Sequence, residues 1–168
     1  MRLAVIGGSF DPVHQGHLAI ALAAKRLLSL DRVIFLIARQ SPHKAYRPNF
    51  SDKQRRGLLD HFTSQYNYID LLDERLINKK NNFTYFSLQK INHSYRPARL
   101  FWLMGADQLE KLHLWRNIDG FLQLAVLVIF ARENYLHKLN SYHFARKYQP
   151  YRLTYERLKI ARSPGWYC

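Results

Sequence analysis

The first residues that could do chemistry lie close to the N-terminus, where residues 7–17 read GGSFDPVHQGH. This segment follows the apolar run Arg2–Ile6 and leads into the Ala- and Leu-rich stretch Gly16–Ser29. Two glycines let backbone amides approach a phosphate closely, and the start of a helix supplies partial positive charge. His14 and His17, three residues apart at that start, can point the same way at a phosphate or its bridging oxygen. The segment therefore predicts a phosphate-binding turn between a strand and a helix.

Other kinds of glycine or histidine site are not indicated. The spacing is not the G-x-G-x-x-G of dinucleotide-binding proteins, and no G-x-x-x-x-G-K-[ST] phosphate loop occurs. A Gly-Gly pair can also be an ordinary turn, and a histidine pair can be half of a metal site or plain surface. Because the one cysteine is Cys168 and no third ligand is evident, we expect no metal held by the protein.

The rest of the chain must supply the sheet and helices that position this turn. Apolar runs predict strands at Arg2–Ile6, Arg32–Ala38, Arg99–Met104 and Ala125–Ala131, and we expect further strands at Tyr68–Leu72 and Arg157–Ala161. Helical patterns occur at Gly16–Ser29, Ser51–Phe62, Phe83–His93, Ile118–Leu122 and Tyr142–Lys147, with a short helix expected after Gly105. In the second of these, Ser51 and Gln54 have the spacing of a capping box. This alternation predicts an α/β fold with a parallel sheet flanked by helices.

Composition restricts the possible classes further. With 168 residues, 48% of them hydrophobic, the chain can form one domain with a substantial core. The longest apolar run, Leu124–Ala131, is too short to cross a membrane, and residues 1–30 carry no signal-peptide pattern, so we expect a cytoplasmic location. The net charge of +14 favours anionic partners, including nucleotides, nucleic acid or acidic membrane surfaces. A basic, solvated surface with no partner explains the charge equally well.

The segment GGSFDPVHQGH resembles the G-G-[TS]-F-D-P-x-H-x-G-H signature of the nucleotidyltransferase superfamily. In that superfamily, H-x-G-H marks adenylyl transfer in a Rossmann-like fold that class I aminoacyl-tRNA synthetases share. Later segments resemble motifs of nicotinate mononucleotide adenylyltransferases, in the same order. They are SPHK at 41–44 for P-P-H-[KR], NFTY at 82–85 for S-Y-T, GADQL at 105–109 with Trp115 for G-x-D-x-L…W, and the strand before Arg132. Ser41 and the Asn82-Phe83 pair depart from the family's residues.

This resemblance implies an enzyme that transfers the adenylyl group of ATP to nicotinate mononucleotide. The products are deamido-NAD and pyrophosphate, and Mg²⁺ is held through the phosphates rather than by the protein. The implied partners are the two substrates, without a membrane; nucleic acid is not expected, although the charge leaves it open. Nothing in the sequence indicates an oligomeric state.

The resemblance also assigns site residues, position by position. The implied ATP-binding residues all lie in the first turn and are Gly7, Gly8, Ser9, Phe10, His14 and His17, of which the two histidines are catalytic. The implied acceptor-binding residues lie later in the chain and are Lys44, Thr84, Gly105, Asp107, Trp115 and Arg132. Among these, Trp115 would stack on the pyridine ring, while Lys44 and Arg132 would neutralise phosphate. The structural alternatives are a core role for Trp115, a solvated Lys44, and helix-capping roles for Thr84 or Asp107.

The resembling family continues into an I-S-[SA]-T-x-I-R segment that contacts the ATP phosphates. Leu158–Cys168 resembles the strand and linker just before that segment. We therefore expect residues 1–168 to be a single nucleotidyltransferase domain, truncated at its C-terminus, with weak ATP binding. Two other functions stay open: a phosphopantetheine adenylyltransferase, and a catalytically weak nucleotide- or RNA-binding relative.

Overall fold

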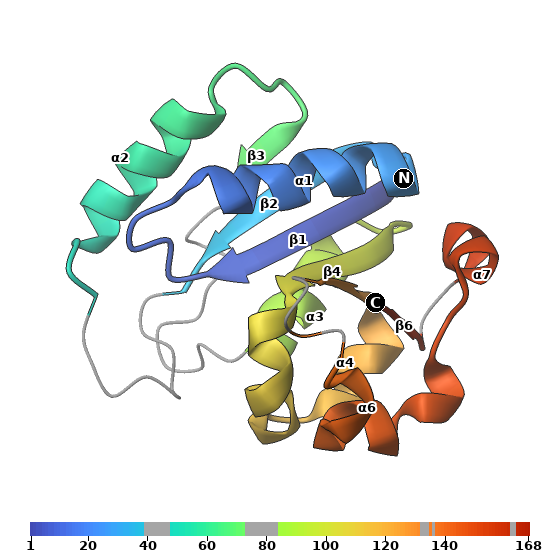
Figure 1. The fold of residues 1–168 in the computed structure, drawn as a ribbon. Coiled ribbons are helices and arrows are strands. Elements are labelled where there is room, and N and C mark those ends of the chain that lie inside the picture. The colour runs from blue at the N-terminus through green and yellow to red at the C-terminus, as the bar shows by residue number, and fades with distance from the viewer. Residues whose placement is uncertain (39–47, 73–83, 132–134, 136, 162–163) are drawn as a thin grey trace.

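A parallel sheet runs through the centre of the molecule (Figure 1). The computed structural model describes residues 1–38, 48–72, 84–131, 135, 137–161 and 164–168. Within them, the strands are β1 (Arg2–Gly8), β2 (Arg32–Ile37), β3 (Ile69–Leu71), β4 (Arg99–Gly105), β5 (Val126–Phe130) and β6 (Trp166–Tyr167). Their order across the sheet is β3-β2-β1-β4-β5-β6, and every pairing is parallel. The predicted α/β fold with a parallel sheet is confirmed.

Helices cover both faces of this sheet. The α-helices are α1 (Gln15–Leu28), α2 (Asp52–Thr63), α3 (Thr84–Ser94), α4 (Ile118–Leu124), α6 (His143–Lys147) and α7 (Tyr155–Ile160). The 3₁₀-helices are η2 (Ala106–Leu114), η3 (Leu139–Ser141) and η4 (Gln149–Tyr151). One hydrophobic cluster joins α1, α2 and α7 to one face of the sheet, and the other joins α3, η2, α4 and α6 to the opposite face. None of the helices in the described part of the chain has the length and hydropathy that crossing a bilayer would require.

The inner residues of β1, β2, β4 and β5 are apolar because both faces of these strands are buried. Along β1, Leu3 and Val5 belong to one cluster, whereas Ala4 and Ile6 belong to the other. This alternation is the period of two expected of a strand, and burial on both sides removes the polar half of the pattern. The sequence could therefore locate these strands but could not say which face each residue occupies.

The start of α2 follows the predicted capping box. The Gln54 backbone N–H donates to Ser51 Oγ at 3.3 Å, and the Ser51 backbone N–H donates to Gln54 Oε1 at 2.9 Å. These two bonds satisfy amides that the helix itself leaves without partners. The prediction for this helix is confirmed to within one residue at its C-terminal end.

The strand predicted at Arg157–Ala161 is wrong, because these residues lie in and just after α7. The Thr154 side chain accepts a hydrogen bond from the Arg157 backbone N–H, which caps the helix, and Leu158 is its one buried residue. The last strand is instead β6, where Trp166 pairs with Leu127 of β5. A short segment such as RLKIA fits either element, and the cap at Thr154 identifies it as a helix.

Candidate active site

The turn after β1 is built around a buried phenylalanine. Phe10 adopts a φ of 45°, which is uncommon for a residue with a side chain, and its ring is only 1% exposed. That ring lies 5.4 Å from the Phe35 ring of β2 and meets the His17 ring edge-on at 4.9 Å. Burial of a large aromatic ring offsets the cost of the backbone conformation. The buried Phe10 ring thus anchors the turn to the core and packs against His17.

The two predicted histidines stack on each other at the start of α1. His14 is the N-cap, and the ring centroids of His14 and His17 are 3.8 Å apart, with the planes tilted by 32°. The His14 backbone N–H donates to His17 Nδ1 at 3.2 Å, so Nδ1 must lack a proton. Neutral His17 therefore carries its proton on Nε2, which makes that atom the hydrogen-bond donor of the ring. The two rings thus lie side by side, and their expected orientation toward a phosphate stays a prediction.

Gly105, one of the later predicted residues, is the last residue of β4, which pairs with β1. Strands β1 and β4 are paired with Ile6 opposite Leu103, and continuing this register brings Gly8 level with Gly105. The glycine turn and Gly105 therefore lie at the same edge of the sheet. The strand order reverses at β1, since β2 lies on one side of it and β4 on the other. Open parallel sheets bind ligands at this kind of topological switch point.

Trp115 comes directly after η2 and is partly buried among aromatic rings. It meets Trp102 of β4 at 5.9 Å and 88°, and Phe121 of α4 at 5.6 Å and 90°. Asp107 is exposed in the first turn of η2, where Oδ2 accepts from Gln108 at 2.7 Å. Because the N-cap of η2 is Gly105, Asp107 does not cap that helix.

Thr84 is the first described residue of α3, which packs against α4. A Cβ atom on Gly120 of α4 would meet the Tyr85 ring at 2.8 Å, so the two helices approach closely just after Thr84. Lys44 and Arg132, the two predicted phosphate-binding cations, lie outside the described residues.

A buried arginine that the sequence analysis missed holds the turn in place. Arg55 of α2 is 0% exposed, and its guanidinium donates to the carbonyl oxygens of Ser9 and of Ala38, the latter at 2.8 Å. The same group forms an ion pair with Asp52 at 2.7 Å. Residue spacing could have predicted the burial of Arg55, because it lies four residues before Leu59 and therefore on the buried face of α2. Arg55 thereby ties the end of β1 to the chain just after β2.

Asp11 makes a second polar tie from the same turn. Its carboxylate accepts from the Asn49 backbone N–H at 2.7 Å, from Asn49 Nδ2 at 3.1 Å and from the Phe50 backbone N–H at 2.9 Å. The Asn49 and Phe50 backbone hydrogen bonds lower the Asp11 pKa below its ordinary value of 3.8. Because the Ala38 N–H also donates to the Gly8 carbonyl at 2.8 Å, the turn holds both Ala38 and Asn49.

Comparison with known proteins now decides the family. A family model described as cytidylyltransferase-like matches residues 5–157. The chain belongs to this family. A Clostridium perfringens protein named "Probable nicotinate-nucleotide adenylyltransferase" is 32% identical over 134 residues, covering 80% of this chain and 66% of the relative. A Clostridium tetani protein of the same name is 33% identical over 135 residues, covering 80% of this chain and 67% of the relative. The chain thus spans about two thirds of the length of these curated relatives.

Solved structures share the fold. A Plasmodium falciparum nicotinic acid mononucleotide adenylyltransferase complexed with NaAD superposes with a TM-score of 0.68 at 17% identity, covering 80% of this chain and 66% of that one. The same protein complexed with APC gives a TM-score of 0.65, again at 17% identity, covering 80% of this chain and 65% of that one. The Rossmann-like nucleotidyltransferase fold expected from the resemblance is confirmed.

Replacing the buried arginine should destabilise the fold. Arg55→Met leaves two carbonyl groups and a carboxylate without their charged donor, and hydrogen bonds to charged groups contribute about 1.5–3 kcal/mol each. We expect the free energy of unfolding in urea to fall by about 3 kcal/mol or more. Lys53→Met, an exposed cation on the same helix, is the matched control and should change it by less than about 0.5 kcal/mol. Equal stability of the two variants would show that the buried guanidinium contributes nothing net.

The Asp11 tie should make part of the stability depend on acid. A carboxylate whose folded pKa is lowered stabilises the fold above its ordinary pKa, and that contribution disappears as the pH falls through the lowered value. Asp11→Asn should therefore lower the melting temperature at pH 7, and the difference from wild type should shrink below pH 3.8. The exposed Asp60→Asn on α2 serves as the control for a lost surface charge. A difference that stays constant into acid would contradict the role given to the Asp11 hydrogen bonds.

Proposed function

We propose that this chain transfers the adenylyl group of ATP to nicotinate mononucleotide, which yields deamido-NAD and pyrophosphate. The observation that carries the proposal is the stacked His14–His17 pair at the start of α1, directly beyond the glycine turn of β1. The names of the curated relatives support the same reaction. We further propose that residues 1–168 act as one nucleotidyltransferase domain in the cytoplasm.

The reaction needs alignment and charge stabilisation more than proton transfer. An oxygen of the mononucleotide phosphate attacks the α-phosphorus of ATP, a P–O bond forms, and the bond to the leaving pyrophosphate breaks. Because the attacking oxygen is already anionic at neutral pH, no general base is required. The site then has to hold the two phosphates in line and stabilise the charge that develops on their oxygens. Backbone amides and imidazole N–H groups are suited to both tasks.

In this mechanism the first turn binds the triphosphate. His17 Nε2–H donates to a phosphate oxygen, since Nδ1 is occupied by the His14 backbone N–H. His14 lies against the same ring and forms the other half of the pair. The amides of Gly7, Gly8, Ser9 and Phe10 line the site, and the dipole of α1 adds partial positive charge.

The acceptor is bound on the β4 side of the same edge. Trp115 offers an aromatic surface for the pyridine ring, and Thr84, Gly105 and Asp107 line its surroundings. Lys44 and Arg132 neutralise the mononucleotide phosphate in this proposal.

In this proposal ATP binds as its Mg²⁺ complex. The Asp11 carboxylate of the first turn is bonded to Asn49 and Phe50, and the groups proposed to face the triphosphate are imidazoles and amides, which fits a Mg²⁺ that keeps phosphate and water ligands. Among the described residues, no three His, Cys, Asp or Glu side chains gather into a metal site. In this proposal the protein groups act on phosphate oxygens, and the ion would supply charge neutralisation.

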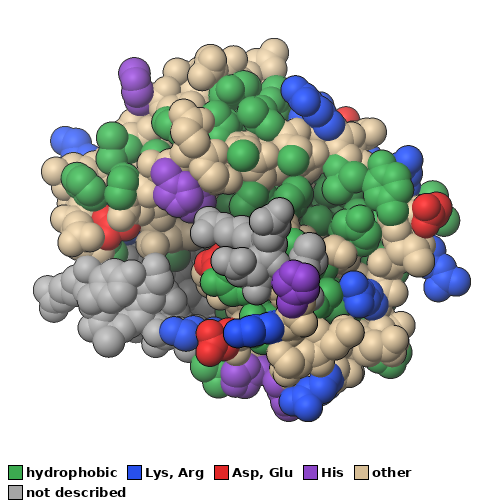
Figure 2. Space-filling model, in the orientation of Figure 1, with side chains coloured by type: hydrophobic (Ala, Val, Ile, Leu, Met, Phe, Trp, Pro, Cys, Tyr) green, Lys and Arg blue, Asp and Glu red, His purple; other side chains and the backbone are tan. Residues whose placement is uncertain are grey.

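Two other functions are less well supported. A phosphopantetheine adenylyltransferase would not need the G-x-D-x-L…W segment that places Trp115 beside β4. An RNA-binding role would be favoured by a concentrated basic surface, but on the face seen in Figure 2 the Lys and Arg side chains are scattered. Adenylyl transfer to the mononucleotide is therefore preferred.

The direct test is to supply the purified chain with ATP, Mg²⁺ and one acceptor at a time. Nicotinate mononucleotide should give pyrophosphate and deamido-NAD, whereas phosphopantetheine should give neither. Nicotinamide mononucleotide, run in parallel, measures the preference for the acid over the amide. Turnover with phosphopantetheine alone would assign the chain to the other branch. RNA binding that weakens with salt, without turnover on any acceptor, would favour the binding role.

Loss of the His17 donor should slow the reaction with little change in the fold. A single transition-state hydrogen-bond donor contributes about 2.7–4 kcal/mol, so His17→Ala should lower kcat at least about a hundredfold. His61→Ala, an exposed histidine in the last turn of α2, is the matched control and should retain full turnover. Melting temperatures of both variants separate catalysis from folding. Near-normal turnover in a folded His17→Ala protein would remove His17 from the mechanism.

A further inference from the structure

Gly7 is required for space rather than for backbone freedom. All seven glycines are described, and none has a positive φ. A Cβ atom on Gly7 would lie 2.4 Å from both Cη2 and Cζ2 of the Trp102 indole, about 1 Å closer than an ordinary contact. By the alternation along β1, Gly7 continues the face of Leu3 and Val5, which is also the face that Trp102 occupies. The indole from β4 therefore fills the space that a side chain on Gly7 would take.

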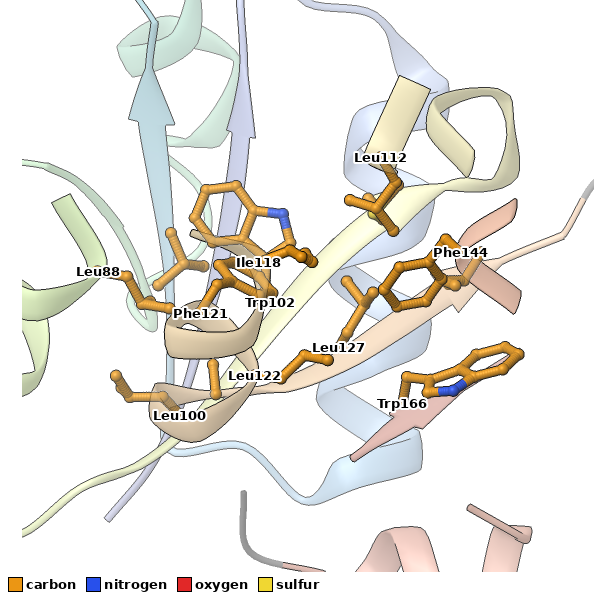
Figure 3. Packing of buried hydrophobic residues seen from close by; sticks show 14 of the residues in the cluster. Leu88, Leu100, Trp102, Leu112, Ile118, Phe121, Leu122, Leu127, Phe144 and Trp166 are labelled. Carbon is orange, nitrogen blue, oxygen red and sulfur yellow. The ribbon is translucent and has the colours of Figure 1, made fainter. Parts of the chain in front are cut away.

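The same indole supports the ring proposed to bind the acceptor. Trp102 is only 2% exposed and meets Trp115 at 88° with 5.9 Å between the ring centroids. Phe121 completes a cluster of three rings, 5.8 Å from Trp102 and 5.6 Å from Trp115. Figure 3 shows Trp102 and Phe121 packed together beside Ile118. A large ring enclosed in this way has few alternative positions.

Trp102 thus lies between two parts of the proposed active site. One end of its indole rests on the backbone of the phosphate-binding turn, and the ring system also packs against Trp115. We propose that Trp102 is a positioning residue whose contact with Gly7 sets the separation between the ATP-binding turn and the acceptor-binding Trp115. This inference rests on the proposed function and names a residue that the sequence motifs did not.

The contact between Gly7 and Trp102 matters because phosphoryl transfer requires the reacting atoms to be placed accurately. In-line attack needs the reacting atoms about 3–3.5 Å apart, and a displacement of about 1 Å can cost a hundredfold in rate. A methyl group at position 7 would force the turn or the indole to move by a similar amount. Shortening the indole to a phenyl ring removes the two atoms that a methyl group would meet. Gly7 and Trp102 are therefore a size-matched pair, and changing both should be less harmful than changing Gly7 alone.

The test compares Gly7→Ala, Trp102→Phe and the double variant in steady-state kinetics. Gly7→Ala should lower kcat/KM for ATP about a hundredfold. Trp102→Phe should raise KM for nicotinate mononucleotide about two- to tenfold, through the loss of the edge-on contact to Trp115, and leave KM for ATP nearly unchanged. The double variant should recover at least tenfold of the loss seen in Gly7→Ala. If Gly7→Ala does not fold, the unequal effect of Trp102→Phe on the two KM values still carries the test.

Trp166→Phe is the matched control, because it makes the same change at a buried tryptophan of the same cluster. In Figure 3, Trp166 lies beside Phe144, on the far side of Leu127 from Trp102. Its replacement should lower the melting temperature and leave both KM values unchanged. A packing role alone for Trp102 predicts that Trp102→Phe behaves like this control and that the double variant is worse than either single one. That result would overturn the proposal.

Failure of the proposed function would be recognised separately. A wild-type chain without turnover refutes adenylyl transfer. In that case, ATP affinities of the Gly7 and Trp102 variants, measured by calorimetry, still test the contact between these two residues. Gly7→Ala should weaken ATP affinity and the added Trp102→Phe should restore it. Loss without recovery overturns the inference, and a wild-type chain that binds neither ATP nor the mononucleotide overturns both proposals.

Discussion

In the proposed mechanism, the site depends on a turn whose backbone amides must be oriented toward a phosphate before the ligand binds. Electrostatic stabilisation of this kind is strong only when the donors are already oriented before reaction, since reorientation would consume the energy gained. In this protein three side chains hold the turn in a fixed orientation. Phe10 holds the turn by burial, Arg55 binds its Ser9 carbonyl, and Asp11 binds the backbone at Asn49. A loop held from β2, α2 and the residues before α2 has little freedom left to lose on binding.

The hydrogen bonds of Asp11 and Arg55 also explain how the turn could bind an anion although it contains the Asp11 carboxylate. Asp11 accepts hydrogen bonds from three N–H groups, and its lowered pKa reflects how well they balance its charge. The Arg55 guanidinium is buried behind the turn and faces two carbonyl oxygens, so it compensates backbone dipoles. The net charge of +14 adds a long-range attraction for nucleotides, which steers them but cannot align a phosphorus atom.

The sequence was most informative where local spacing decides the structure. The eleven residues from Gly7 to His17 predicted the turn and the adjacent histidines, and Ser51 with Gln54 predicted the start of α2. The contact between Gly7 and Trp102 could not be predicted, because it depends on the register between β1 and β4. Arg55 was missed because an arginine in a helix is usually assigned to the solvated face. The misassigned strand at residues 157–161 shows that a short segment, without its capping residue, does not distinguish helix from strand. The binding and catalytic roles of all the site residues stay predictions, and Lys44 and Arg132 also lie outside the described residues.

A further constraint follows because the proposed ATP-binding turn and the proposed acceptor-binding Trp115 pack on opposite faces of the sheet. Phe10 and α1 pack in the cluster on one face, whereas Trp102 and Trp115 pack in the cluster on the other. A side chain at position 7 would displace either the Trp102 ring or the β1 backbone. Because Gly7 has no side chain, the Trp102 ring lies directly against the backbone that carries the amides proposed to bind phosphate. Interiors packed to crystal density transmit such a contact as a displacement rather than absorbing it. In the proposed mechanism, a displacement of the Trp102 ring would therefore reach the phosphate-binding turn directly through Gly7.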